Sequence, residues 1–279
     1  MEESTIASFW DEHPCGQDLI TSAPETYLEF FDEYDEYRYR TEGHILKCLD
    51  DIEFRGKRVL EVGLGQGADS EQIVRRGARW SGIDVTRASV QRVQARFALR
   101  SLKAESLQVG SAVDLPFEDE SFDLVYSHGV LHHIPNIFMA QAEISRVLKP
   151  EGRLVAMLYA KYSLNYILSI ALVRRLALAI CYTVGIEPKG KSGEHVRLAR
   201  EAGLLNYLKM SSFVHRNTDG PLNPYSKVYS LSSVKEDFRG FDLENYHKEF
   251  MHAPPLPVGK LPFAPLLGWH LWVNLRKKQ

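Results

Sequence analysis

The sequence has few cysteines and no excess of charge of either sign. Its 279 residues include three cysteines, Cys15, Cys48 and Cys181, and no Cys-x-x-Cys pair. This spacing argues against a disulfide framework and a cysteine-rich zinc site. Lys and Arg total 34 against 36 Asp and Glu, so the formal net charge is −2. Such a balance gives no electrostatic footprint for nucleic acid, and none is expected as a partner.

The sequence also has no evident signal peptide and no uninterrupted membrane span. Residues 1–9 carry two glutamates and no apolar run, unlike a signal peptide. Residues 164–186 are mostly apolar, but Arg174 and Arg175 lie at the centre of this stretch. On an insertion scale the two arginines cost roughly 5–7 kcal/mol, and the eleven Leu, Ile and Val residues return roughly 3–7 kcal/mol. We therefore expect a soluble helix or helix pair in a cytoplasmic protein.

Hydrophobic patterning divides the chain into four parts. Residues 1–56 are expected to be helical, and residues 57–158 alternate short apolar runs with amphipathic stretches. Residues 159–230 are expected to form a helical cap or lid, and residues 231–279 a helix and an antiparallel strand pair. The alternation in the second part predicts right-handed βαβ units and a mostly parallel sheet with helices on both faces. The expected fold class is α/β and Rossmann-like, with ligands at the carboxyl ends of the strands.

A glycine-rich turn follows the first predicted strand. Residues 59–68, Val-Leu-Glu-Val-Gly-Leu-Gly-Gln-Gly-Ala, read as a strand, a turn and the start of a helix. Glycines permit positive φ and let a ligand approach the backbone closely. Asp84 ends the next predicted strand, where a carboxylate can accept hydrogen bonds from a ribose diol. The predicted ligand therefore contains a nucleoside, although Gly63, Gly65 and Ala68 also satisfy the dinucleotide pattern.

Glu61 helps to choose between nucleoside ligands. It lies two residues before the turn, on the strand that leads to the expected pocket. A carboxylate there favours a cationic group and repels a pyrophosphate, by several kcal/mol at about 4 Å and intermediate dielectric. S-adenosylmethionine carries a sulfonium and an ammonium and has no phosphate. The alternative is that Glu61 points into solvent or pairs with a lysine.

Five motifs in order resemble the class I S-adenosylmethionine-dependent methyltransferases, in particular the small-molecule branch similar to the ubiquinone and menaquinone biosynthesis methyltransferases. The motifs occupy residues 59–67, 82–84, 110–117, 121–125 and 148–152. The resemblance covers about residues 57–158, with a weaker match at the C-terminal strands. It implies a seven-stranded sheet whose terminal antiparallel hairpin pairs residues 244–250 with 269–275, and an N-terminal segment that covers the active site.

The resemblance also implies a cofactor site for S-adenosyl-L-methionine. Its expected residues are Glu61, Gly63 and Gly65 at the methionine end, Asp84 at the ribose hydroxyls, Val85, Ser111 and Ala112 around the adenine, and Ser127 and His128 at the end of the fourth strand. The family often has Asp or Asn where this chain has Ser111. A serine hydroxyl can still bond the adenine amine, but its reach is shorter.

Two histidines are the predicted catalytic residues. Methyl transfer chiefly requires an aligned nucleophile and exclusion of water, and a general base is needed only when the acceptor loses a proton. His132 and His133 follow the fourth strand, beside the expected cofactor, and histidine titrates near neutrality. The alternative is that these side chains pack on the adenosine or cap the next helix.

The predicted substrate-binding residues are His13, Tyr159, Tyr162 and Tyr166. The tyrosines open the apolar cap, which suggests an acceptor with a hydrophobic or aromatic body. The alternative is that the cap's apolar residues form its own core or a dimer interface. No metal is expected, because His195, His215 and Asp219 match no standard ligand spacing.

The leading hypothesis is a methyltransferase acting on a small molecule, as a monomer or homodimer. One alternative is an NAD(P)-dependent oxidoreductase that uses the same glycine turn. Another is a non-catalytic cofactor-binding module of the same fold. Binding of S-adenosylmethionine against NADH separates the first two, and a methyl acceptor separates the first from the third.

Overall fold

The computed structural model describes residues 3–14 and 27–279 of the chain. Cys15 therefore lies outside the described residues, and Cys48 and Cys181 are free thiols. The helices of the N-terminal part are α1 (Glu3–Glu12), α2 (Tyr27–Thr41) and α3 (His44–Asp50). These three helices make up most of the described residues up to position 56.

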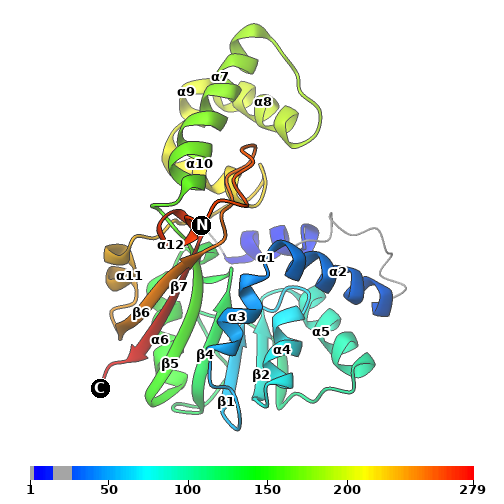
Figure 1. The fold of residues 1–279 in the computed structure, drawn as a ribbon, viewed down its shortest axis with the longest axis vertical. Coiled ribbons are helices and arrows are strands. Elements are labelled where there is room, and N and C mark those ends of the chain that lie inside the picture. The colour runs from blue at the N-terminus through cyan, green and yellow to red at the C-terminus, as the bar shows by residue number, and fades with distance from the viewer. Residues whose placement is uncertain (1–2, 15–26) are drawn as a thin grey trace.

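A seven-stranded sheet forms the centre of the molecule, with strand order β3-β2-β1-β4-β5-β7-β6 (Figure 1). Five strands are mutually parallel: β1 (Arg58–Val62), β2 (Arg79–Asp84), β3 (Ser106–Val109), β4 (Phe122–His128) and β5 (Leu148–Tyr159). The strand β7 (His270–Lys277) runs antiparallel between β5 and β6 (Phe241–Glu249). The predicted seven-stranded, mostly parallel sheet with a terminal antiparallel pair is confirmed. Strand order reverses beside β1, the position where open α/β sheets bind ligands.

Helices cover both faces of this sheet. The helices α4 (Ala68–Arg75) and α5 (Arg87–Leu99) pack with α3 on one face, and α6 (Ile137–Val147) packs with α11 (Leu231–Asp237) on the other. Successive side chains of β1 point to opposite faces of the sheet. Val59 packs in the core beneath α3, α4 and α5, and Leu60 packs in the core beneath α6 and α11. Burial on both faces is why the strands read as continuous apolar runs.

Local signals start the two helices that follow β1 and β2. The helix α4 begins after Gly67, whose φ of 77° is left-handed and favours glycine. The helix α5 begins after Thr86, whose side chain accepts a hydrogen bond from the Ser89 backbone N–H. Each helix therefore starts directly at the carboxyl end of a strand, where the cavity described below lies.

The helix α2 is fixed across α5 by a buried arginine. Arg96 of α5 is fully buried and donates to Asp35 of α2 at 2.8 and 2.9 Å and to Glu71 of α4 at 3.0 Å. Its guanidinium also lies 4.4 Å from the centre of the Phe31 ring. These contacts hold α2 over the carboxyl ends of the strands.

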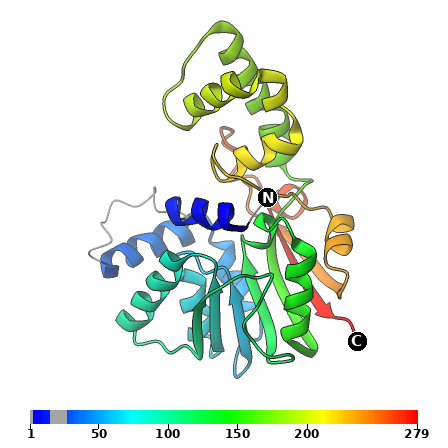
Figure 2. The same ribbon diagram turned by 180° about the vertical axis from the view of Figure 1, so that it is seen from behind.

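A helical cap stands apart from the sheet, at the top of Figures 1 and 2. It comprises η4 (Asn165–Arg174), a π-helix, followed by α7 (Arg175–Val184), α8 (Lys191–Ala202), α9 (Leu204–Tyr207) and α10 (Met210–Thr218). The cap has its own core, which includes Ile170, Leu178, Val196, Tyr207 and Phe213. Two short helices elsewhere are η3 (Leu131–His133) and α12 (Ala264–Leu267).

The joined helix η4–α7 is the one described element that is long and apolar enough to cross a membrane. It spans Asn165–Val184, with a mean hydropathy of 1.8, and 17% of that window is buried. Arg174 anchors its inner side, because the guanidinium donates to the Pro254 carbonyl at 3.0 Å and to the Asn217 carbonyl at 2.7 Å. The helix is thus packed along one side and exposed along the other.

Candidate active site

A cavity opens at the carboxyl ends of β1, β2, β4 and β5, beneath α1 and α2. Its floor includes the glycine turn after β1 and apolar side chains of the neighbouring strands and loops, and its roof includes Trp10 and Tyr34. Predicted site residues that line it are Glu61, Gly63, Gly65, Asp84, Val85, Ala112, His128, His133 and Tyr159. The structure thus brings together residues that are separated by almost one hundred positions in the sequence.

Two glycines of the turn have different roles. Gly63 has a φ of 81°, and a Cβ at this position would lie 2.1 Å from a methyl carbon of Val130. Gly65 has a φ of 52°, and a Cβ there would meet no atom within 4 Å. Gly63 is therefore required by packing inside the protein, whereas Gly65 leaves open space in which a ligand can approach the backbone.

Asp84 closes this turn at the end of β2. Its carboxylate accepts hydrogen bonds from the Leu64 N–H at 2.7 Å and from the N–H and hydroxyl of Thr86, both at 2.8 Å. Burial raises the pKa of Asp84, and these hydrogen bonds oppose that rise. The carboxylate lines the cavity, so it both fixes the loop and presents acceptors to a ligand.

Glu61 is buried in the cavity wall and does not point into solvent or pair with a lysine. Its side chain is 2% exposed and accepts a hydrogen bond from the Trp80 indole N–H at 2.8 Å. Burial, assisted by the negative charge of Asp69, raises the pKa of Glu61 to about 8. At neutral pH the carboxyl is therefore mostly protonated until a cation approaches it.

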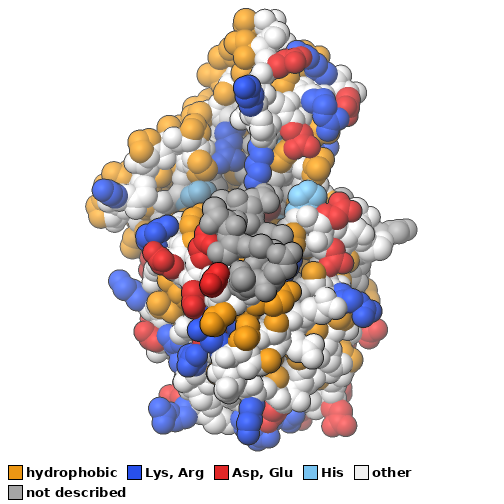
Figure 3. All heavy atoms as spheres, turned by 90° about the vertical axis from the view of Figure 1, so that its right-hand side faces the viewer, with side chains coloured by type: hydrophobic (Ala, Val, Ile, Leu, Met, Phe, Trp, Pro, Cys, Tyr) orange, Lys and Arg blue, Asp and Glu red, His pale blue; other side chains and the backbone are white. Residues whose placement is uncertain are grey.

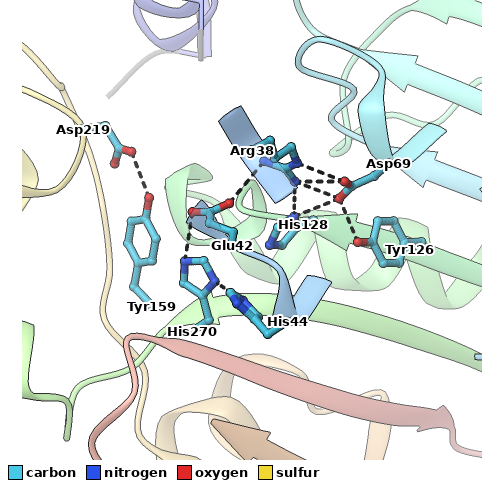
Figure 4. A network of polar contacts seen from close by, with 9 residues as sticks. All are labelled: Arg38, Glu42, His44, Asp69, Tyr126, His128, Tyr159, Asp219 and His270. Carbon is cyan, nitrogen blue, oxygen red and sulfur yellow. Dashed lines mark hydrogen bonds and ion pairs between the residues drawn. The ribbon is translucent and has the colours of Figure 1, made fainter. Parts of the chain in front are cut away.

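A buried ion-pair network lies beside Glu61 (Figure 4). Arg38 of α2 donates to both carboxylate oxygens of Asp69 at 3.0 Å, and the Tyr126 hydroxyl donates to Asp69 at 2.9 Å. Burial alone would raise the pKa of Asp69, but Arg38 and His128 lower it well below the ordinary value. Asp69 and Arg38 therefore stay charged across the physiological range and keep the wall polar at this point.

His128 joins the network from the end of β4. Its Nδ1 lies 2.9 Å from Asp69 and 2.8 Å from an Arg38 nitrogen, and its ring stacks on Trp272 with centroids 5.1 Å apart. Within residues 3–14 and 27–279, its buried Nε2 has no hydrogen-bond partner. The cavity wall therefore presents one ring nitrogen that a ligand can satisfy.

A second polar chain leads away from Arg38. Arg38 Nη1 lies 3.4 Å from Glu42 Oε2, and Glu42 Oε1 lies 3.9 Å from His270 Nε2. On the other side of that ring, His270 Nδ1 lies 3.0 Å from His44 Nε2. Burial, assisted by nearby positive charge, lowers the pKa of His44 to about 3 and that of His270 well below its ordinary value. Both rings are therefore neutral. Figure 4 shows them below Arg38 and His128, away from Asp69.

A third group faces the cavity from the loops around the cap. The Tyr159 hydroxyl donates to Asp219 Oδ1 at 2.9 Å, and the other carboxylate oxygen lies 3.4 Å from His133 Nε2. His133 Nδ1 lies 2.8 Å from the Tyr225 carbonyl, which assigns the ring hydrogen to Nδ1. Trp10 packs edge-on against His133, with ring centroids 5.0 Å apart.

His132 lies behind this group and does not line the cavity. It is fully buried, and its ring lies 3.8 Å from the Tyr159 ring, between centroids. Burial and the neighbouring histidines lower its pKa well below the ordinary value. Of the two predicted bases, the structure therefore brings only His133 to the cavity.

Several other predicted residues also lie outside the cavity wall. Ser127 is buried and donates to the Val62 carbonyl at 2.9 Å, and Ser111 accepts from the Val113 N–H at 3.0 Å. His13 is exposed and stacks on Phe9, Tyr162 is 58% exposed, and Tyr166 packs against the core of the cap. Their proposed roles stay predictions.

Sequence reasoning missed much of the polar wall. The missed residues that line the cavity include Trp10, Tyr34, Arg38, Asp69, Asp219 and His270. Asp69 alone carried a usable signal, because it lies in the first turn of the helix that follows the glycine loop. Arg38 and Asp219 reach the cavity through tertiary packing, for which no local pattern exists.

Comparison with known proteins finds a family match for the central part of the chain. Residues 60–156 match the methyltransferase domain family. Phthiotriol/phenolphthiotriol dimycocerosates methyltransferase 1 of Mycobacterium ulcerans is 40% identical over 106 residues, 37% of this chain and 38% of that protein. Ubiquinone biosynthesis O-methyltransferase of Alkalilimnicola ehrlichii is 26% identical over 216 residues, 76% of this chain and 79% of that protein.

Solved structures agree with the sequence comparisons on the fold. The crystal structure of an S-adenosylmethionine-dependent methyltransferase from Aquifex aeolicus superposes with a TM-score of 0.53 at 16% identity, over 92% of this chain and 100% of that chain. The aligned region spans less than two thirds of the mycobacterial relative's length. These similarities do not favour the oxidoreductase or the non-catalytic alternative. The sequence comparisons therefore support a class I S-adenosylmethionine-dependent methyltransferase that resembles the ubiquinone biosynthesis methyltransferases.

Proposed function

We propose that the protein transfers a methyl group from S-adenosylmethionine to a hydroxyl of a small molecule with a hydrophobic body. One observation carries this proposal: a single cavity joins the glycine turn and Asp84 to the group formed by Tyr159, Asp219 and His133. The first half suits a nucleoside, and the second half suits the removal of a proton. Both halves are needed when the acceptor is deprotonated as it attacks.

The residues of the first half fit the cofactor. Asp84 would accept hydrogen bonds from the ribose hydroxyls, Gly65 leaves space beside the backbone, and Val85 and Ala112 offer an apolar wall for the adenine. Glu61 would hold a positively charged group at the methionine end. When bound, the cofactor supplies a methyl group already activated by its sulfonium. The roles of Ser111, Ser127 and His128 in this half belong to the same proposal.

The residues of the second half can accept the proton of the acceptor hydroxyl. His133 carries its ring hydrogen on Nδ1, so Nε2 holds the free electron pair. Protonation of Nε2 would create an ion pair with Asp219, 3.4 Å away, and Tyr159 already donates to the other oxygen of that carboxylate. The Asp219 carboxylate thus lies beside the nitrogen at which the proton would arrive.

The roof of the cavity excludes water and aligns the reactants. Trp10 of α1 covers His133, and Tyr34 of α2 lines the same cavity. In-line transfer depends chiefly on such alignment, because the methyl group needs no further activation by the protein. We propose that residues 1–56 serve as this cover, residues 57–158 as the cofactor-binding core, residues 159–230 as a cap or lid, and residues 231–279 as the completion of the sheet.

The relatives support the acceptor class. One is named for ubiquinone biosynthesis and O-methylation, and another for phthiotriol and phenolphthiotriol dimycocerosates. We propose a hydroxylated acceptor of comparable hydrophobic character and not a nucleic acid. Action in the cytoplasm, as a monomer or homodimer, is part of the proposal and is supported by the free thiols of Cys48 and Cys181.

Two measurements test the proposal. Calorimetric titration should show S-adenosylmethionine binding at least about tenfold more tightly than NADH, a difference of roughly 1.4 kcal/mol. Radiolabelled methyl transfer to a panel of hydroxylated aromatic lipids should then identify an acceptor, and the His133→Ala variant should lose transfer while retaining cofactor binding. Preferential NADH binding, cofactor binding without transfer to any acceptor, or transfer to amine or thiol acceptors only would overturn it.

A further inference from the structure

The outer side of the cap helix carries a continuous apolar stripe. Five large side chains between 49% and 68% exposed form it: Ile167, Leu172, Leu176, Ile180 and Val184. Their spacing is five residues through the π-helical part and four residues through α7, which keeps them on one side of the helix. Figure 3 shows hydrophobic side chains gathered along one margin of the cap.

The inner side of the same helix is committed to the protein. Ile170 and Leu178 lie in the core of the cap, and Arg174 donates to the carbonyls of Pro254 and Asn217. A spanning orientation would break these contacts and bury a charged guanidinium in hydrocarbon. The stripe can therefore meet an apolar phase only from one side, with the helix lying parallel to the surface.

The cap is also strongly basic, although the chain as a whole is not. Residues 161–218 contain nine Lys and Arg and three Glu, which gives a net charge of +6, so the remaining residues carry −8. Figure 3 shows blue Lys and Arg side chains on the cap beside its apolar margin. An apolar face with a basic surround is the pattern of helices that lie in the interface of an anionic bilayer.

The same charge argues against a second copy of the chain as the occupant of the stripe. Two caps facing each other would bring net charges of +6 together, and this like-charge contact opposes association. An anionic lipid surface, in contrast, complements the cap and is repelled by the acidic remainder of the chain. The charge distribution therefore favours a lipid surface over self-association.

Exposed apolar side chains lie between the cavity and the start of the cap helix. Tyr162, which is 58% exposed, follows cavity-lining Tyr159 by three residues, a distance of at most about 11 Å along an extended chain. The Tyr162 and Leu266 carbonyls both accept hydrogen bonds from Lys248 Nζ, at 2.8 and 2.9 Å, so the 71% exposed Leu266 adjoins the same end of the helix. The apolar surface thus extends from the cap towards the mouth of the cavity.

We propose that the cap docks on the surface of an anionic bilayer, with the stripe inserted into the interface and the helix parallel to the membrane plane. Docking would hold the cavity near the lipid phase without any span. The binding itself requires neither the cofactor nor the acceptor. It therefore stands or falls independently of the proposed methyl transfer.

Vesicle co-sedimentation of the full chain, without cofactor or acceptor, tests the proposal. The vesicles contain phosphatidylcholine alone or with about one third phosphatidylglycerol, a proportion within the range of anionic membranes. We expect binding to the anionic vesicles, weaker binding to the neutral ones, and weakening by salt. Alkaline carbonate should release the bound protein from the vesicles, because in the proposed docking no helix spans the bilayer.

A triple variant and a matched control make the test specific. The variant Leu172→Glu, Leu176→Glu, Ile180→Glu should lower the partition coefficient on the order of a hundredfold. The control variant Leu99→Glu, Met139→Glu, Tyr246→Glu replaces side chains of similar exposure on α5, α6 and β6 and should change it less than about threefold. Circular dichroism and melting temperature confirm that both variants fold.

Three outcomes would overturn the proposal. The first is that the wild-type protein fails to bind anionic vesicles or that the triple variant binds as well as wild type. The second is a wild-type dimer in sedimentation velocity that the triple variant dissociates, which would make the stripe a subunit interface. The third is resistance to carbonate extraction, which would indicate a spanning helix.

Discussion

Binding of S-adenosylmethionine should release a proton from Glu61. The carboxyl is buried against Trp80, and burial raises its pKa to about 8, so below that pH it is protonated in the cofactor-free protein. A cationic group at the methionine end favours the ionised form and draws the pKa down. Neighbouring Asp69 and Arg38 stay charged throughout, so they contribute a constant field and not a titration.

The expected pH dependence follows from linkage. Below about pH 8 each unit of acidification costs up to tenfold in cofactor affinity, which is about 1.4 kcal/mol per unit. Between pH 6 and pH 8 the dissociation constant should therefore fall by up to about a hundredfold. The Glu61→Gln variant should show little dependence, match wild type near pH 6 and bind at least about tenfold more weakly at pH 9.

Calorimetry in buffers of different ionisation enthalpy counts the protons directly. We expect close to one proton released per cofactor at pH 6, with Glu61→Gln releasing none at that pH. Adenosine, which lacks both cationic groups, serves as the ligand control and should show no release. The reasoning fails if wild type releases no proton at pH 6, or if Glu61→Gln retains the wild-type pH dependence.

Three further predictions concern the fold and the proposed base. Gly63→Ala should cost on the order of 3 kcal/mol in unfolding free energy, because its Cβ meets Val130, whereas Gly65→Ala should cost only about 1 kcal/mol, from its positive φ, and weaken cofactor binding. His133→Ala should lower kcat by about a hundredfold or more, measured as the rate of methyl transfer across a series of pH values. His132→Ala should chiefly lower the melting temperature. Arg38→Ala should cost about 3–5 kcal/mol in chemical denaturation, because it leaves Asp69 charged and buried.

Each of these predictions has a contradicting result. Equal stability of the two glycine variants would show that the turn relaxes around Val130. An unchanged kcat in His133→Ala would leave this histidine as packing. For Arg38, the Asp69→Asn variant is the matched control, because it removes the charge that Arg38 neutralises; the Arg38→Ala change in that background should be milder, and an equal loss would refute the buried-charge explanation.

The core of the fold could be predicted because its signals are local. Alternating runs between residues 57 and 158 reproduce β1 to β5, since β1, β2 and β4 are mostly buried and the helices α4 and α5 start at a glycine turn and a side-chain cap. Glu61, Gly63, Gly65 and Asp84 line the cavity because motif residues at strand ends share one edge of the sheet.

The rest of the site depends on long-range packing. Arg38 meets Asp69 across 31 residues, and Tyr159 meets Asp219 across 60, so no periodicity could pair them. Tyr162 is expected to overhang the acceptor pocket because it follows β5; its side chain is 58% exposed, and its role as a substrate contact stays a prediction. The direction of a side chain after a strand ends is set by tertiary contacts.

The interior position of β7 has a consequence for how this enzyme can be handled. The region that matches the family, residues 60–156, ends inside β5. In the complete sheet β5 pairs with β7 through seven residue pairs, from Arg153 opposite Arg276 to Tyr159 opposite His270. A fragment cut after the matched region would expose that edge and invite pairing between molecules. Any truncation or chimera must therefore retain the distant β7, which closes the sheet only after the whole cap has been synthesised.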